Sequence, residues 1–185
     1  MRKLIAQELV SMDGFFAGPN GEIDWHNVDD EYSEYAKDFL DTLDVLLFGR
    51  VTYQLMEDYW ITASGDIAHK MNTLPKIVFS KTLKNVGWQN TRLVVDHVVD
   101  EIKNLKSQSG KDLAILGSGD LVSYLMNAGL IDEYQITVVP VVMGTGKPLF
   151  KDIHDRVNMK LLKSKTLRSG SVQLFYQPLG REGLS

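Results

Sequence analysis

The chain has 185 residues, and its hydrophobic content of 44% and charged content of 24% are ordinary for a soluble globular protein. The formal net charge of −4 disfavours nucleic acid or an anionic membrane as the main partner. Because the chain contains no cysteine, disulfides and a thiol nucleophile are excluded. This length suits one domain with its own core, so we expect residues 1–185 to form a single domain.

The N-terminus and the apolar segments bear on where the protein resides. Gln7 and Glu8 interrupt the first apolar run too early for a signal peptide. No apolar run approaches the roughly 20 residues that are needed to span a bilayer. We therefore expect a cytoplasmic protein that has no membrane partner.

Residues 3–10 are predicted to form the first strand, and residues 11–25 a long loop that is rich in turn-forming residues such as Asp13-Gly14. The loop also carries large apolar side chains, namely Phe15, Phe16, Ile23 and Trp25. Such side chains either form a mobile lid over a ligand or anchor the loop to the core, and the sequence favours neither role.

Residues 29–43 are predicted to form a helix, because apolar side chains recur at helical spacing from Tyr32 to Leu43. Asp29, Asp30 and Glu31 stand at its start. Carboxylates in this position cap the helix and complement its dipole, which is the expected role of at least two of the three.

Two apolar strands are each followed by glycine and then by a helix. Residues 45–48 lead to Gly49, Arg50 and Thr52, and residues 113–116 lead to Gly117-Ser118-Gly119. A strand, a small-residue turn and a helix N-terminus can hold a phosphate on backbone N–H groups. The second turn alone is more simply a tight turn without a ligand, since it is not a full G-x-G-x-x-G motif. Two such turns in one chain make a paired phosphate site more credible.

The remaining pattern completes a mixed sheet. Further strands are predicted over residues 76–79, 92–95 and 132–142, a helix from residue 98 with Asp96 as its cap, and a closing hairpin of residues 159–168 and 171–177. Strands and helices alternate first, and strands alone follow. We therefore expect an α/β fold with a mainly parallel sheet, flanking helices and an antiparallel C-terminal edge.

Ligands of such sheets bind at the carboxyl ends of the parallel strands, where Gly49, Ser80 and Gly117 are expected to lie. The four histidines lack the spacing of metal ligands, so no metal site is predicted. Phosphate recognition without a nucleophile or a metal suits a cofactor that supplies its own chemistry, above all hydride transfer from a nicotinamide. Arg50, Lys81 and Ser80 suit a 2′-phosphate, which favours NADPH over NADH.

Several segments together resemble one family. They are Ser-Met-Asp-Gly-Phe-Phe-Ala-Gly-Pro-Asn-Gly (11–21), Phe-Gly-Arg-Val-Thr-Tyr (48–53), Val-Phe-Ser-Lys-Thr-Leu (78–83), Leu-Gly-Ser-Gly-Asp-Leu (116–121), Gly-Leu-Ile-Asp-Glu (129–133) and Val-Val-Pro-Val-Val-Met-Gly-Thr-Gly-Lys-Pro-Leu-Phe (138–150). The family is that of the dihydrofolate-reductase-like proteins, in the branch close to the reductase domain of the bifunctional riboflavin-biosynthesis deaminase-reductase. The resemblance implies an α/β fold with a mixed sheet, an NADPH cofactor and a homodimer.

The resemblance also implies roles for particular residues. Contacts with the cofactor phosphates fall to Gly49, Arg50 and Thr52, and the adenosine 2′-phosphate faces Ser80 and Lys81. The pyrophosphate is wrapped by the second turn and the helix after it, namely Gly117, Ser118, Gly119, Asp120 and Leu121. The family's mobile substrate loop matches residues 11–21, so the expected substrate-loop residues are Asp13, Gly14, Phe16 and Trp25.

The proton donor is ambiguous. Matching Asp24-Trp25 to the family's Pro-Trp places the acid at Asp30, whereas counting back from Gly49 leads to Ser33 or Glu34. Thr137 matches the threonine that supports this acid. Dihydrofolate reductases carry Leu-Pro-Gly-Arg where this chain reads Leu74-Pro75-Lys76, which disfavours folate as the substrate.

These observations predict an NADPH-dependent reductase of a small heterocyclic substrate, pteridine-like or pyrimidine-like. Two alternatives stay open at this point. One is a true dihydrofolate reductase, and the other is a non-catalytic nucleotide-binding protein that has kept the fold and lost the acid.

Overall fold

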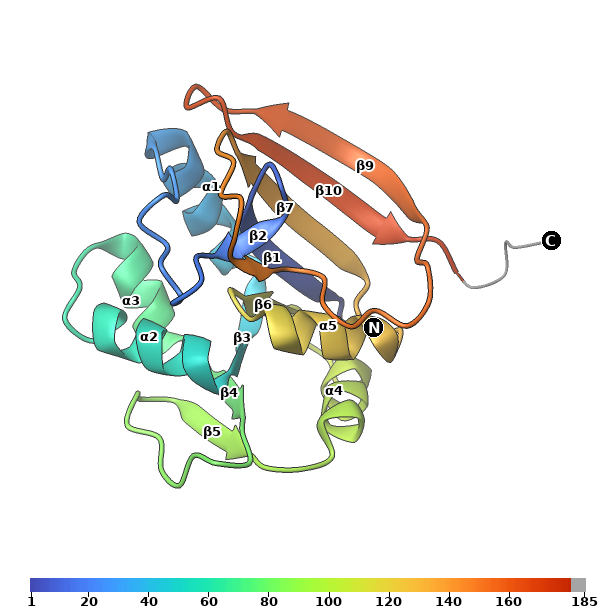
Figure 1. Ribbon diagram of the computed structural model, residues 1–185. Helices are drawn as coiled ribbons and strands as arrows, with labels where there is room; N and C mark the ends of the chain where they lie inside the picture. The colour runs from blue at the N-terminus through green and yellow to red at the C-terminus, as the bar shows by residue number, and fades with distance from the viewer. Residues whose placement is uncertain (181–185) are drawn as a thin grey trace.

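The computed structural model describes residues 1–180, which form one sheet of eight strands with helices on both faces (Figure 1). The strand order is β5-β4-β3-β6-β1-β7-β10-β9. The strands are β1 (Leu4–Ser11), β3 (Leu43–Gly49), β4 (Lys76–Phe79), β5 (Thr91–Val94), β6 (Asp112–Leu116), β7 (Glu133–Val139), β9 (Met159–Thr166) and β10 (Val172–Pro178). All neighbours from β5 to β7 are parallel, and β10 is antiparallel to both β7 and β9. The predicted fold class, a mainly parallel sheet with an antiparallel C-terminal edge, is confirmed.

The apolar runs in the sequence become central strands that are covered on both faces. Leu46 and Leu47 of β3 are neighbours in sequence and point to opposite faces, yet both are fully buried. The helices are α1 (Asp30–Asp41), α2 (Arg50–Trp60), α3 (Asp66–Thr73), α4 (Val98–Ser107) and α5 (Gly119–Asn127). Side chains of α4 and α5 cover one face of the sheet, and those of α1, α2 and α3 cover the other. No helix within residues 1–180 has the length and apolarity needed to cross a membrane.

Two predicted boundaries and one predicted helix cap are wrong for local reasons. Helix α1 ends at Asp41, because Leu43 is already a buried residue of β3. Strand β7 ends at Val139, since Pro140 has no N–H to continue an interior strand. Helix α4 is not capped by Asp96, whose carboxylate lies 3.7 Å from Lys81 Nζ, and its N-cap is His97 in the left-handed conformation.

Two strands lie outside the main sheet. They are β2 (Phe15–Ala17) and β8 (Lys147–Pro148), which pair with each other in antiparallel fashion. This pairing ties the long loop after β1 to the glycine-rich segment after β7. The loop of residues 11–25 is therefore held across the carboxyl end of the sheet, where Figure 1 shows β2 in front of β1 and β7.

A buried lysine fastens α3 to the sheet. The side chain of Lys76 is 1% exposed, and its Nζ donates to the carbonyl oxygens of Met71 at 2.8 Å, Asn72 at 3.2 Å and Leu74 at 2.6 Å. The ammonium group also lies 4.5 Å from the ring centroid of Trp88. Burial lowers the pKa of Lys76 to about 8.

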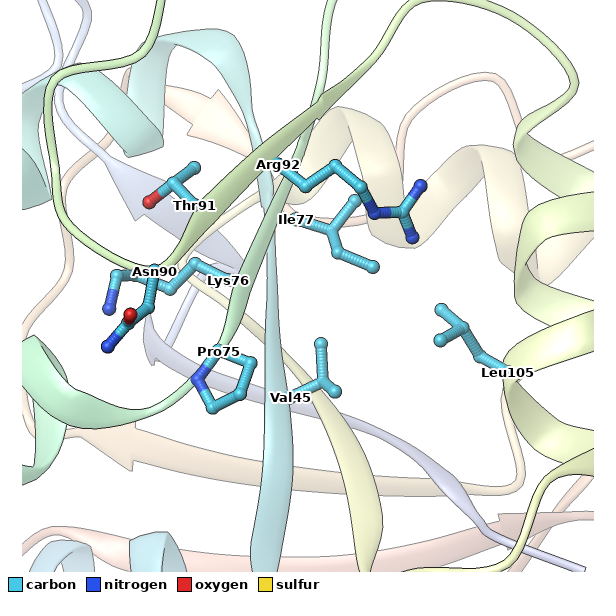
Figure 2. Close-up of a pocket in the computed structure, with 8 residues that line it drawn as sticks. All are labelled: Val45, Pro75, Lys76, Ile77, Asn90, Thr91, Arg92 and Leu105. Carbon is cyan, nitrogen blue, oxygen red and sulfur yellow. The ribbon is translucent and has the colours of Figure 1, made fainter.

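Lys76 also borders a surface pocket that is drawn in Figure 2. Val45, Ile77, Arg92 and Leu105 surround the opening, while Lys76 points to the other side, toward Asn90. The pocket lies at the amino-terminal ends of β3, β4 and β5. It is thus at the edge opposite to the one where ligands of parallel sheets bind, and none of the predicted site residues lines it.

We predict that Lys76→Met lowers the free energy of unfolding by about 2–3 kcal/mol, because one buried and two partly buried carbonyl groups lose a charged donor. Urea unfolding followed by tryptophan fluorescence measures this loss. Lys84→Met, at an exposed position, is the control and should change stability by less than about 0.5 kcal/mol. An unchanged midpoint for Lys76→Met would show that the lysine does not fasten α3.

Candidate cofactor and active site

The two strand–glycine–helix turns lie side by side. Strand β3 runs between β4 and β6 in the sheet, so the turn at Gly49 adjoins the turn at Gly117. The backbone N–H of Gly49 donates to Ser118 Oγ at 3.0 Å, and Thr52 Oγ1 donates to the carbonyl oxygen of Gly117 at 2.6 Å. The expectation that the two turns form one joint site at the carboxyl edge of the sheet therefore has a geometric basis.

Backbone geometry explains the glycines of the second turn. Gly117 has a φ of +62°, a conformation that side chains other than glycine rarely adopt. A Cβ at Gly119 would lie 2.5 Å from the ring of Phe16. Neither α2 nor α5 has a side chain that caps its first N–H groups, in contrast to α1, where Asp29 Oδ1 accepts from the N–H of Tyr32 at 2.8 Å.

This arrangement determines which groups face a ligand. The hydroxyls of Thr52 and Ser118 are engaged inside the protein, between the two turns. The helical hydrogen bonds of α5 start with Val122 N–H, which donates to the carbonyl oxygen of Ser118. The N–H groups of the first turn of α5, those of Gly119, Asp120 and Leu121, thus remain for an anion.

A buried carboxylate lies beneath the second turn and was not predicted as a site residue. Glu8 of β1 is 2% exposed, and its Oε1 accepts from the N–H of Ser118 at 3.0 Å. The N–H of Gly117 also donates to this carboxylate. Burial raises the pKa of Glu8 to about 8, and the two N–H donors oppose part of that rise. The one sequence signal for this residue is a charge within the apolar run of the first strand.

The predicted cations lie at the same edge. Arg50 opens α2, and its exposed guanidinium donates to Gln54 Oε1 at 3.0 Å. Ser80 and Lys81 follow β4, which is the strand next to β3. Ser80 Oγ accepts from the N–H of Leu83 at 3.0 Å, and the ammonium group of Lys81 is exposed beside Asp96. Along the edge, Ser80 of β4 is therefore followed by Gly49 of β3, Gly117 of β6 and the end of β1.

The loop of residues 11–25 is anchored near its start, at Asp13 and Gly14. The carboxylate of Asp13 accepts from the N–H groups of Met143 at 3.1 Å and Gly144 at 2.7 Å. The hydroxyl of Ser11 and these N–H groups lower the pKa of Asp13 to about 2. The next residue, Gly14, has a φ of +86° and accepts a hydrogen bond from the N–H of Leu149.

The aromatic residues of this loop have different positions. Phe16 is half-buried against Gly119 at the start of α5. Trp25 is also half-buried; its Nε1 donates to the carbonyl oxygen of Glu22 at 3.2 Å, and its ring meets that of His26 edge to face. Phe16 thus lies over the first turn of α5, whereas Trp25 packs within the loop itself.

The two candidate acids lie on the outside of α1. Asp30 is exposed in its first turn, and Glu34 is exposed one turn later, in a surface groove with Ser64 and Asp66. Thr137 of β7 is 2% exposed and pairs in register with Leu9. Among the described residues, no hydrogen bond joins either carboxylate to Thr137, so the structure does not bring together the acid and the threonine as the resemblance implies.

Tyrosines take the inward positions of α1. Gln7 Nε2 donates to the hydroxyl of Tyr32 at 2.6 Å, and the hydroxyl of Tyr35 donates to Gln135 Oε1 at 2.5 Å. Burial raises the pKa of both tyrosines far above its usual range. Gln173 of β10 lies beside Thr137 in register, and its Nε2 has no partner within residues 1–180. The sequence did not predict this polar layer between α1 and the sheet. Its glutamines belong to strands and its tyrosines to a helix far away in sequence, and together they form no recognisable motif.

Stability should depend on pH through Glu8. Its pKa rises from 4.5 when unfolded to about 8 when folded, so the folded chain holds a proton that the unfolded chain releases between these values. Stability is therefore full below about pH 4.5 and falls as the pH rises to about 8. We predict that Glu8→Gln removes this fall, which is of the order of 5 kcal/mol.

Urea unfolding of both proteins at several pH values tests this. Lys76 titrates in both proteins, so its contribution cancels in the difference. Asp155→Asn, at an exposed position, is the control and should keep the wild-type slope. Parallel stability curves for the wild type and Glu8→Gln would show that Glu8 does not titrate as described.

Comparison with known proteins places this geometry in a family. The family model of the RibD C-terminal domain matches residues 2–173 of the chain. The uncharacterized protein YyaP of Bacillus subtilis (strain 168) is 34% identical over 180 residues, which cover 95% of this chain and 94% of YyaP.

Two solved structures show the same fold. A putative riboflavin biosynthesis protein from Shewanella sp. PV-4 superposes with a TM-score of 0.78 at 24% identity, and the match covers 96% of this chain and 99% of that one. Dihydrofolate reductase from Enterococcus faecalis, in complex with NADP(H) and RAB-propyl, superposes with a TM-score of 0.67 at 17% identity, covering 95% and 96% of the two chains. The dihydrofolate-reductase-like fold is thereby confirmed, and the chain belongs to the RibD C-terminal domain family.

Proposed function

We propose that the protein is an NADPH-dependent reductase of a small heterocyclic substrate, pyrimidine-like or pteridine-like. The observation that carries this proposal is the junction of the turns at Gly49 and Gly117, which leaves the first N–H groups of α2 and α5 uncapped beside exposed cations. Membership of the RibD C-terminal domain family supports a reductase. A homodimer in the cytoplasm is the expected state.

The residues of the carboxyl edge fit a dinucleotide that carries several phosphates. In this proposal the N–H groups at the start of α2 and α5 hold the pyrophosphate, and Arg50 beside them contacts the cofactor phosphates, the 2′-phosphate included. Ser80 and Lys81 hold the 2′-phosphate from the neighbouring strand. When bound, NADPH would supply a hydride.

The remaining residues act on the substrate. The loop with Asp13, Gly14, Phe16 and Trp25 covers the reaction site, and its anchoring through Asp13 keeps bulk water away from one side. Asp30, or Glu34 one turn later, supplies the proton that accompanies the reduction, either directly or through water.

The structure bears on the two alternatives. Folate reduction is disfavoured, because Lys76 stands where the family's Gly-Arg would grip the folate tail and its ammonium group is buried against α3. A non-catalytic nucleotide-binding protein is favoured by one observation: α1 turns Tyr32 and Tyr35, not a carboxylate, toward the sheet. The following two predictions separate this candidate from the enzyme.

The first prediction concerns the cofactor. NADPH should bind at least about tenfold tighter than NADH, which corresponds to about 1.4 kcal/mol, because Arg50 and Lys81 place two cations near the 2′-phosphate. Titration by intrinsic tryptophan fluorescence measures both affinities. Lys81→Gln should reduce the preference, whereas Lys84→Gln, at an exposed position without a role in the site, should not. Equal affinities of the wild type for both cofactors would refute the assignment of Arg50 and Lys81.

The second prediction concerns the acid. Asp30→Asn should lower the rate of NADPH oxidation by about 10²–10⁴-fold at little cost in cofactor affinity, on whichever pterin, pyrimidinone or other small carbonyl substrate responds. Asp29, not Asp30, caps α1, so the substitution spares the cap. Asp38→Asn, exposed on the same helix, is the control.

Three outcomes are informative. A rate loss in Glu34→Gln in place of Asp30→Asn would move the acid by one helical turn and keep the enzyme. Binding of NADPH with no turnover in the wild type or either variant would favour the non-catalytic protein. Turnover that is unaffected by both substitutions would refute the two carboxylates as proton donors.

A further inference from the structure

Glu8 lies at the point where the two glycine turns and the first strand meet. Its carboxylate accepts the N–H groups of both Gly117 and Ser118. Ser118 in turn accepts from Gly49, and Gly117 accepts from Thr52. One side chain of β1 is therefore connected, through a single layer of hydrogen bonds, to the starts of α2 and α5.

The hydrogen bonds to Glu8 determine which backbone N–H groups of the turn can bind an anion. The turn alone would offer the N–H groups of Gly117 and Ser118 to a phosphate, but Glu8 takes both from beneath. The turn is thereby fixed with these N–H groups pointing into the protein, and the later N–H groups of Gly119, Asp120 and Leu121 point onward from it. A carboxylate in this place orients the anion site without touching the anion.

The surroundings of Glu8 hold no opposing cation among the described residues. Strand β7 contributes Ile136, which pairs with Glu8 in register, and the connection from β6 contributes only its two N–H groups. The titratable side chains nearby are Tyr32 of α1, whose pKa the charge of Glu8 helps to raise, and the exposed Asp120 of α5. The ionised form of Glu8 is thus balanced by N–H dipoles alone.

We propose that Glu8 is a positioning residue for the cofactor pyrophosphate, which it serves by holding the Gly117–Ser118 turn from beneath. This inference rests on the proposed function. It adds that the neutral carboxyl is the form compatible with a bound anion, since ionisation places a negative charge under the site. Cofactor affinity should therefore fall as Glu8 ionises, and binding should take up a proton.

Glu8→Gln separates this role from a merely structural one. Glutamine keeps the acceptor oxygen and the side-chain length but stays neutral at every pH. We expect the dissociation constant of the wild type for NADPH to rise about three- to tenfold between about pH 6.5 and about pH 9.5 as Glu8 ionises. The constant for Glu8→Gln should match the wild type at the lower pH and stay there. Lys76 titrates in both proteins, and Asp155→Asn, at an exposed position, controls for loss of a surface charge.

Glu8→Ala tests the alignment itself. It leaves two buried N–H groups without an acceptor, so the turn loses its support. NADPH affinity should fall at least about tenfold at the lower pH, an effect that glutamine rescues. Binding is read from quenching of tryptophan fluorescence, and the folded fraction from circular dichroism at the same pH. If the alanine variant does not fold, the comparison of glutamate with glutamine still decides.

The outcomes are distinguishable. Identical pH dependence of affinity in the wild type and Glu8→Gln, with tight binding in both, would overturn the role of Glu8 and leave the cofactor assignment intact. Failure of the folded wild type to bind NADPH at any pH would overturn the proposed function, and the role of Glu8 with it. A pH-dependent wild type beside a pH-independent Glu8→Gln supports the proposal.

Discussion

The hydrogen-bonded junction of the turns at Gly49 and Gly117 is the constraint on which the candidate site depends. Parallel strands end at one edge, so two strand–glycine–helix turns on adjacent strands must meet there. Bonds from Gly49 to Ser118 and from Thr52 to Gly117 fix how they meet, and Glu8 fixes the second turn from below. Two helix N-termini then open toward the same place, which is the electrostatic basis of an anion site.

The protein buries two ionisable side chains near this sheet, one basic and one acidic. Lys76 donates to three carbonyl groups at the end of α3 and thereby satisfies a helix C-terminus. Glu8 accepts two N–H groups just before a helix N-terminus. Each charge meets backbone dipoles of the favourable sign. Burial shifts the pKa of each group to about 8, upward for Glu8 and downward for Lys76, although only Glu8 lies at the candidate site.

In the proposed function, the substrate lies near α1, which carries both candidate acids. There the inward side chains are tyrosines bonded to glutamines of β1 and β7, while Asp30 and Glu34 point outward. A small substrate that reached this polar layer would meet neutral donors and acceptors before any carboxylate. Neutral amide and hydroxyl groups can donate hydrogen bonds to a heterocycle and accept them from it. This suits a pyrimidine-like or pteridine-like ring, which carries both donors and acceptors.

The sequence by itself determined the elements, the sheet type and the edge that carries the site, because hydrophobic period and glycine placement are local properties. It also determined that Gly49 and Gly117 follow parallel strands. Only the tertiary structure decided that Glu8 supports the second turn and that Asp30 points outward. It also decided that the hydroxyls of Thr52 and Ser118 form hydrogen bonds between the two turns. These facts depend on contacts between residues about 20 to 110 positions apart, which a local pattern does not encode.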